Sequence, residues 1–394
     1  RSYSVTGVQT CALPIYTWWF VDPEGCLFWS HGIDCVSEWS ETGIAHREHY
    51  FRDLPDRDGP FGSFYGKGRW APHGFYQGKT PFDTFSFYRA NLFRKYGEGW
   101  QAAWADVSHA RLRSWGLNSI GNWSSRDVYL RQRTPYVATI HIGGPTLAGS
   151  EGYWGKFHDV FAEGFRANLR RQLEAKDREA ADPWCIGFFV DNELGWGDEL
   201  SLALATLQSP PDQPAKSVFL ADLQSKYGDI AALNAAWGTE HADWQALQEA
   251  RQGPDRQRAG ADLAAFYTKT AETYFRTIKE ELAAAAPNHL YLGCRFAWVN
   301  DRAAQAALAF CDVVSYNRYE TSVAGMRLPG GASRPIIIGE FHFGALDRGM
   351  FHTGLRAARD QQHRAELYRS YVEGALRHPL IVGTHWFQIG RAHV

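Results

Sequence analysis

Eight short apolar runs recur along this chain of 394 residues, and helical stretches separate most of them. Each run is nearly continuous rather than alternating, as in strands that are buried on both faces of a parallel sheet. Strands that alternate with helices favour either a closed (β/α)8 barrel or an open doubly wound sheet. The runs are residues 27–36, 117–123, 136–142, 185–190, 290–298, 312–316, 335–339 and 380–387.

The helices between the runs are expected where apolar residues recur at helical spacing. In residues 100–115, for example, Trp100, Trp104, Val107 and Leu112 approximate one face. The eight runs, and the lack of a G-x-G-x-x-G motif after the first of them, favour the closed (β/α)8 TIM barrel of the α/β class over the open sheet. The other expected helices are residues 157–176, 261–286, 301–310 and 356–377.

Two connections are much longer than the usual few residues. Residues 37–91 follow the first strand, and residues 197–260 follow the fourth. Both insertions leave the carboxyl ends of their strands, which is the face where barrel enzymes build their active sites. We expect them to form the walls of a substrate cleft, with extra packing layers as the alternative.

The two ends of the chain are related to each other in an unusual way. Residues 389–394 can be encoded by an oligonucleotide whose reverse complement, shifted by one base, encodes Thr10 to Ile15. Translated adapter sequence is the simplest explanation, so we expect residues 1–15 and 389–394 to be scars that flank one catalytic domain over residues 16–388. On this interpretation the chain stops just after the eighth strand, and the eighth helix is absent.

The composition excludes several classes of protein. The formal net charge of −2 gives no electrostatic basis for binding nucleic acid or an anionic membrane, and no apolar run approaches the roughly 18 residues of a membrane span. None of the six cysteines forms a C-x-x-C pair, and no glycine-rich phosphate motif follows a strand. We therefore expect no metal and no organic cofactor. The 16 tryptophans offer flat faces to sugar rings, although core packing accounts for most of them.

Two carboxylates follow buried strands at the expected catalytic rim. Glu193 comes after the fourth run in the sequence Asp191-Asn192-Glu193, and Glu340 comes after the seventh. Glutamate is seldom buried without a partner, so a pair at this depth requires an explanation. Glycosidic cleavage uses such a pair, because one carboxyl group protonates the leaving oxygen while the other attacks the anomeric carbon. The alternative is that each Glu forms a salt bridge with an arginine beneath the rim.

An Asn-Glu pair after strand four and a Glu after strand seven resemble the pattern of the clan A glycoside hydrolases. Residues 227–230, 233–234 and 236–239 (YGDI, LN and AWGT) are similar to the insertion after strand four of family 42 β-galactosidases and family 50 β-agarases. The segment GLNSIGNW, residues 116–123, looks more like family 50. This resemblance covers roughly residues 20–388.

The resemblance implies a role for each matching residue. Glu193 would be the general acid/base and Glu340 the nucleophile of a retaining mechanism, with their carboxyl groups about 5–5.5 Å apart. Asn192 would hydrogen-bond the sugar 2-hydroxyl, Tyr316 would orient the nucleophile, and Trp386 would lie under the cleaved sugar unless it only fills the core.

Three further polar residues in or after apolar strands are weaker candidates for sugar ligands. They are His141 after strand three, Asn122 after strand two and Arg295 within strand five, and Arg295 is equally well interpreted as the structural partner of a carboxylate.

The sequence thus predicts a retaining β-glycoside hydrolase that acts on a β-linked, galactose-containing glycan of the agarose type. β-Galactosidase or β-glucanase activity, and a non-catalytic glycan-binding barrel, are the alternatives. The expected partner is a carbohydrate, not a nucleic acid or a membrane, and a polymeric substrate would imply export from the cell. The sequence does not indicate the oligomeric state.

Overall fold

The computed structural model describes residues 9–12, 17–350 and 352–388, so most of the two expected scars lies outside the described residues. The chain divides into two compact units. The described residues up to Gly32 and from Tyr136 onward form the first, which we call the barrel unit, and residues 33–135 form the second unit. Among the described residues, no helix combines the length and the apolar character needed to cross a membrane.

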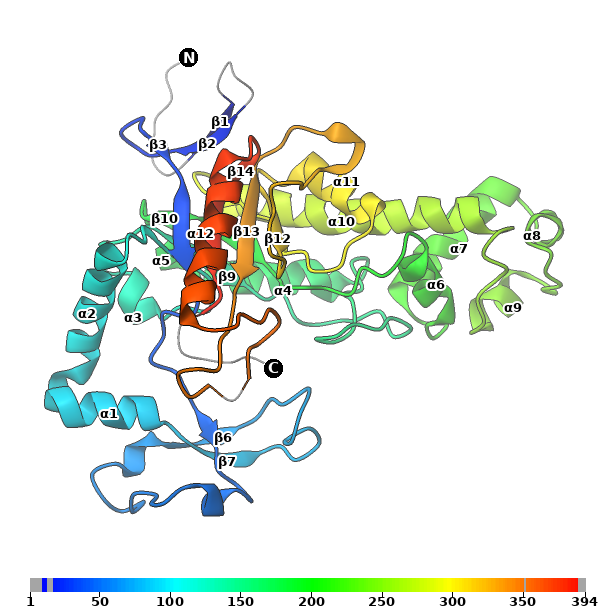
Figure 1. Cartoon of the computed structure of the whole chain (residues 1–394). Coiled ribbons are helices and arrows are strands. Elements are labelled where there is room, and N and C mark those ends of the chain that lie inside the picture. Colours follow the sequence, from blue (N-terminus) through cyan, green and yellow to red (C-terminus); the bar gives the residue numbers. More distant parts are fainter. Residues whose placement is uncertain (1–8, 13–16, 351, 389–394) are drawn as a thin grey trace. The chain divides into compact units, whose positions relative to one another are not determined.

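One sheet of eight strands confirms the expected (β/α)8 fold (Figure 1). The strands lie in the order β11-β10-β9-β8-β4-β14-β13-β12. A parallel bridge between Phe296 and Tyr316 joins the segment after β11 to β12, and so connects the two ends of this order. The strands are β4 (Ser30–Ile33), β8 (Ser119–Ile120), β9 (Tyr136–Ile140), β10 (Cys185–Val190), β11 (Leu290–Tyr291), β12 (Val314–Asn317), β13 (Ile336–Phe341) and β14 (Ile381–Trp386).

The fifth strand is much shorter than its apolar run predicts. β11 ends at Tyr291, because Gly293 (φ 80°) and Arg295 (φ 56°) adopt left-handed backbone conformations that an extended strand cannot contain. Arg295 therefore follows the fifth strand, and the expectation that it lies within the strand is wrong. Glu340, in contrast, lies inside β13 and not after it.

Helices cover the strands of the barrel unit, and two of them begin at capping side chains. Asn300 accepts from the Ala303 N–H at the start of α11, and Asp360 accepts from the His363 N–H at the start of α12. Within the described residues no helix follows β14. The helices are α4 (Glu163–Glu174), α5 (Asp177–Ala180), α10 (Gly260–Ala285), α11 (Asp301–Phe310) and α12 (Gln361–Arg377), with the 3-10 helix η4 (Pro329–Gly331).

The insertion after β10 folds as an additional helical layer against α10. Asp262 of α10 accepts hydrogen bonds from Tyr227 Oη at 2.7 Å and Trp237 Nε1 at 2.8 Å, and forms an ion pair with Lys226. The residues that resemble family 42 and family 50 sequences thus hold this layer in place. Its helices are α6 (Ser201–Gln208), α7 (Pro214–Tyr227), α8 (Ile230–Trp237) and α9 (Trp244–Glu249).

The second unit has an aromatic core of its own. Phe64 and Phe85 are 5% and 1% exposed, and Phe64 packs edge-on against Trp100 with a centroid distance of 6.2 Å. Its elements are β5 (Thr42–Gly43), β6 (Tyr65–Gly68), β7 (Phe82–Phe85), α1 (Phe87–Tyr96), α2 (Trp100–Ser114) and α3 (Arg126–Tyr129), with the 3-10 helices η1 (Glu48–Tyr50), η2 (Gly62–Phe64) and η3 (Gly97–Gly99); β8 also lies in this unit.

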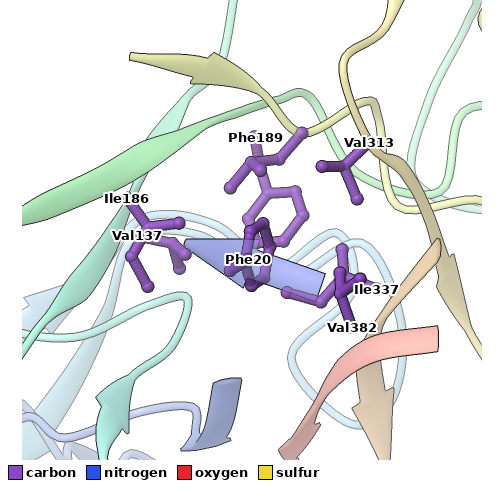
Figure 2. Packing of buried hydrophobic residues seen from close by; sticks show 8 residues of the cluster. Phe20, Val137, Ile186, Phe189, Val313, Ile337 and Val382 are labelled. Carbon is purple, nitrogen blue, oxygen red and sulfur yellow. The ribbon is translucent and has the colours of Figure 1, made fainter. Parts of the chain in front are cut away.

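A small antiparallel sheet precedes the first barrel strand and supplies the floor of the barrel. Its strands are β1 (Gln9–Ala12), β2 (Trp18–Val21) and β3 (Leu27–Phe28). Phe20 of β2 is fully buried among apolar side chains that come mostly from the beginnings of the strands (Figure 2). The floor therefore closes the amino-terminal end of the barrel. Its other members are Val137, Ile186, Phe189, Leu292, Val313, Ile337 and Val382.

We predict that Phe20→Ala destabilises the chain by about 3–5 kcal/mol, because it removes the ring that fills this layer and leaves a cavity. Chemical denaturation followed by tryptophan fluorescence measures the change. Leu27→Ala is the matched control, since Leu27 belongs to the same small sheet but is 49% exposed. Equal stabilities for the two variants would show that Phe20 is not part of the core.

Candidate active site

The turn after β10 carries two residues in left-handed backbone conformations. Asp191 has φ 60° and Glu193 has φ 49°. The Asp191 N–H donates to Ile140 O at 2.7 Å, and the Glu193 N–H donates to Arg295 O at 3.3 Å. Such conformations cost about 1–3 kcal/mol each and persist where the surroundings determine them, which happens most often at functional sites.

Asp191 anchors this turn from beneath. Its carboxylate is buried and accepts from the Ile142 N–H at 3.0 Å, from His158 Nε2 at 3.0 Å and from Tyr274 Oη at 2.9 Å. Burial alone would raise the pKa of Asp191, but the charge and hydrogen bond of His158 outweigh it and lower the pKa. Burial alone would lower the pKa of His158, and Asp191 raises it instead. The two residues therefore form a buried, hydrogen-bonded pair in which each favours the charged form of the other.

Glu193 is partly buried, and two side chains donate to its carboxyl group. Asn317 Nδ2 donates to Oε1 and Trp154 Nε1 donates to Oε2, both at 2.8 Å. Burial, followed by the negative charge of Glu340, raises the pKa of Glu193, and these two hydrogen bonds oppose the rise. A carboxyl group with a raised pKa is suited to donating a proton near neutral pH.

Glu340 is 5% exposed, and its carboxylate oxygens have different donors. Arg295 Nη2 donates to Oε1, and Tyr319 Oη donates to Oε2 at 2.5 Å. The contact expected of Tyr316 is thus made by Tyr319. The Tyr316 ring instead packs against Phe296, at a centroid distance of 5.6 Å.

Arg295 joins the two carboxylate-bearing segments. Its guanidinium is fully buried, and besides Glu340 it contacts Asn192, with Nε donating to Asn192 Oδ1 at 2.8 Å. A Cβ atom at Gly339 would lie 2.8 Å from Arg295 Nη1 and 2.9 Å from Asn317 Oδ1. The glycine before Glu340 therefore leaves the space that this network occupies. Of the two interpretations of Arg295, the structure shows the carboxylate partner.

Trp386, His141 and Asn122 are the remaining sequence candidates. Trp386 is 5% exposed and packs against Phe341 and the α12 residue Tyr368, at 5.2 and 5.1 Å between ring centroids, as the core-filling interpretation expects. His141 follows β9, and its side chain keeps exposed surface. Desolvation lowers the pKa of His141, the charge of Asp191 opposes this shift, and the charge of Arg295 adds to it. Asn122 belongs to the second unit, where its N–H donates to Asp34 Oδ1 at 2.7 Å.

Six residues of the site do not appear among the sequence candidates, and Asp191 and its donor Tyr274 are two of them. Asn317 is the last residue of the apolar strand β12, and Tyr319 follows it. A polar residue at the end of an apolar strand is the criterion that selected Asn122 and His141, and it would also have selected these two. Trp154 and His158 lie in the connection after β9, where no local pattern marks them. Within the described part of the chain, no group of three His, Cys, Asp or Glu residues is placed to hold a metal ion.

A parallel barrel with two glutamates joined by an Arg–Asn network at the carboxyl ends of its strands has the architecture of the barrel glycoside hydrolases. Comparison with known proteins agrees with this class. The chain is 33% identical to β-agarase B and 34% identical to β-agarase A of Vibrio sp. (strain JT0107), in each case over 94% of its length. It spans 43% and 40% of these two relatives. No family model matches.

Agarases are also found among the solved structures that resemble this chain. An exo-β-agarase structure has a TM-score of 0.90 and 29% identity, covering all of this chain and 62% of its own. The agarase AgWH50C has a TM-score of 0.83 and 33% identity, covering 97% of this chain and 59% of its own. The chain is therefore similar, over nearly its whole length, to part of these β-agarases.

We predict that His158→Gln destabilises the chain in a pH-dependent way. The pKa of His158 is raised in the folded state, so the stability from its pairing with Asp191 is fully present below the unfolded value of about 6.5 and is lost as the pH rises through the folded value. Removing one partner of a buried ion pair costs about 3–5 kcal/mol where both are charged.

Melting temperatures between pH 5 and pH 9 measure this difference. The gap between the parent chain and His158→Gln should be widest at the acidic end and should narrow as the pH rises. His352→Gln, at an exposed position, is the control and should show no such trend. A gap that stays constant with pH would contradict a charged His158–Asp191 pair.

Proposed function

We propose that this chain is the catalytic barrel of a retaining β-glycoside hydrolase, with Glu193 as the acid/base and Glu340 as the nucleophile. One observation carries the proposal: Arg295, Asn192 and Asn317 connect the two carboxyl groups in one hydrogen-bonded network. The pKa of Glu193 is raised, in part by the charge of Glu340. Double displacement requires a proton donor beside a nucleophilic carboxyl group, and a raised pKa suits Glu193 to the donor role.

In the first step, an oxygen of Glu340 attacks the anomeric carbon and forms a glycosyl ester. Glu193 donates its proton to the glycosidic oxygen as the bond to the leaving sugar breaks. In the second step, the Glu193 carboxylate removes a proton from water, and this water attacks the anomeric carbon and releases Glu340. Arg295 and Tyr319 donate to the Glu340 carboxylate and hold it in one orientation for the attack.

Asn192 is placed to contact the sugar beside the reacting carbon. Its Oδ1 accepts from Arg295 Nε at 2.8 Å and from Asn317 Nδ2 at 3.3 Å. These donors fix which way the amide points, so that Nδ2 is the group directed away from them. We assign to Nδ2 a hydrogen bond to the sugar 2-hydroxyl, a contact that strengthens in the transition state.

The proposed substrate is a β-linked, galactose-containing glycan of the agarose type. Support comes from the two relatives named β-agarases, which match 94% of this chain. A panel of agarose, other β-galactans and β-glucans, with the products separated by chain length, tests this choice. If sugar is released only from β-glucan, the activity is that of a β-glucanase. If it is released only from simple β-galactosides, the activity is that of a β-galactosidase. A polymeric substrate would imply export from the cell.

We predict that Glu340→Gly abolishes hydrolysis, because no glycosyl ester can form. Added azide fits the vacated space and should restore turnover of an activated aryl β-glycoside, giving a glycosyl azide of inverted anomeric configuration. Kinetic assay and nuclear magnetic resonance of the product measure both outcomes. If Glu340→Gly keeps full activity, Glu340 is not the nucleophile.

We predict a different defect for Glu193→Ala. The loss should be about 10²–10⁴-fold on a natural glycan, whose leaving sugar needs a proton. It should be much smaller for the first step on an aryl glycoside with an acidic phenol, which leaves without protonation. Pre-steady-state release of the phenol measures that step. Equal losses on both substrates would rule out the acid role of Glu193.

A further inference from the structure

Three exposed aromatic side chains of the barrel unit contact one another. Trp298 is 70% exposed, Tyr153 is 49% and Trp154 is 40%. The Tyr153 ring packs edge-on against Trp154 at 4.8 Å between centroids, and lies 6.4 Å from Trp298. We call these three residues the aromatic cluster. Among the described residues of the barrel unit, the other large aromatic side chain that is exposed is Trp184, at 36%, directly before β10.

Exposed apolar surface of this kind needs a reason. Scattered apolar side chains are normal on a protein surface, but contiguous patches mark binding sites. Large aromatic rings gain most from burial, so a group of three that stays in water is suited to burying a ligand. The flat shape of the rings favours a ligand with a flat apolar face, such as a pyranose ring.

One member of the aromatic cluster contacts the proposed acid/base residue, Glu193. Trp154 Nε1 donates to Glu193 Oε2 at 2.8 Å. Trp154 lies in the connection after β9, and Trp298 lies in the connection after β11. β9 and β11 are the two strands that pair with β10, and Glu193 follows β10. The aromatic residues therefore come from both neighbours of the strand that carries the acid.

We propose that Tyr153, Trp154 and Trp298 bind the sugar ring on the leaving-group side of the bond that is cleaved. This inference rests on the proposed function. Glu193 protonates the bridging oxygen, and that oxygen departs with the leaving sugar. Side chains grouped at Glu193 therefore face the leaving sugar, whereas Glu340 and its donors Arg295 and Tyr319 face the sugar that becomes bound to the enzyme.

Besides contacting the sugar, Trp154 acts in this proposal as a positioning residue for Glu193. Its indole N–H holds one oxygen of Glu193 while Asn317 holds the other. The Trp154 hydrogen bond favours the ionised carboxylate and lowers the pKa of Glu193. Trp154→Phe keeps an aromatic face for the sugar but removes the donor, so it separates this task from sugar binding.

The first test compares two substrates with the same glycone. A β-linked oligosaccharide places a ring on the leaving-group side, and the corresponding β-glycosyl fluoride places none there. We expect Trp298→Ala to lower kcat/KM on the oligosaccharide about tenfold and to change it less than about twofold on the fluoride. Trp184→Ala removes the same kind of ring from an exposed position away from Glu193, just before β10, and as the control it should change neither value. Parallel losses on both substrates, or no loss on either, would overturn the assignment.

A binding measurement separates this inference from the proposed function. Tryptophan fluorescence titration with the same oligosaccharide requires no turnover. If the parent chain hydrolyses nothing but binds about tenfold more tightly than Trp298→Ala, the sugar site stands and the hydrolase assignment fails. If Trp298→Ala and the parent bind alike, or neither binds, the sugar site is wrong.

The pH profile tests the positioning role of Trp154. Trp154→Phe should move the alkaline limb of kcat/KM on the oligosaccharide to higher pH, because loss of the hydrogen bond raises the pKa of the acid. A residue that only supports the loop would lower the rate without moving the limb. An unmoved limb would therefore exclude this role.

Discussion

Arg295 carries a guanidinium group with no solvent exposure, and a charge in that position is costly unless it is paired and hydrogen-bonded. Glu340 provides the opposite charge and Asn192 provides an acceptor. The backbone of Arg295 also accepts from the Glu193 N–H. One residue thus holds both glutamates, and its own burial is tolerated only because both segments are in place. The site and this part of the core stabilise each other.

The positions of the two glutamates could be predicted because they depend on topology. Parallel strands place their carboxyl ends on one rim, so an apolar run followed by Glu is informative wherever it occurs. The backbone conformation after a strand, in contrast, does not follow from the topology of the sheet. The end of β11 depends on the left-handed backbones of Gly293 and Arg295, and only Gly293 signals such a conformation in the sequence.

Side-chain direction explains the other differences between expectation and structure. Tyr316 and Tyr319 are three residues apart, and the sequence alone does not show where β12 ends and which of them turns toward Glu340. The His158–Asp191–Tyr274 contacts join residues from a loop, a turn and a helix that are distant in sequence. No periodic pattern records contacts of that kind, so they become visible only when the fold is known.

The floor of the barrel has a consequence for how the chain is made. Phe20 packs with Val137 and Ile186, but also with Ile337 and Val382, so the layer joins residues from opposite ends of the sequence. Contacts of such high sequence separation form late and slow the folding of a domain. A growing chain on the ribosome cannot complete this layer until Val382 has emerged. Until then the apolar beginnings of the early strands lack this cover, and exposed apolar surface of that kind favours aggregation.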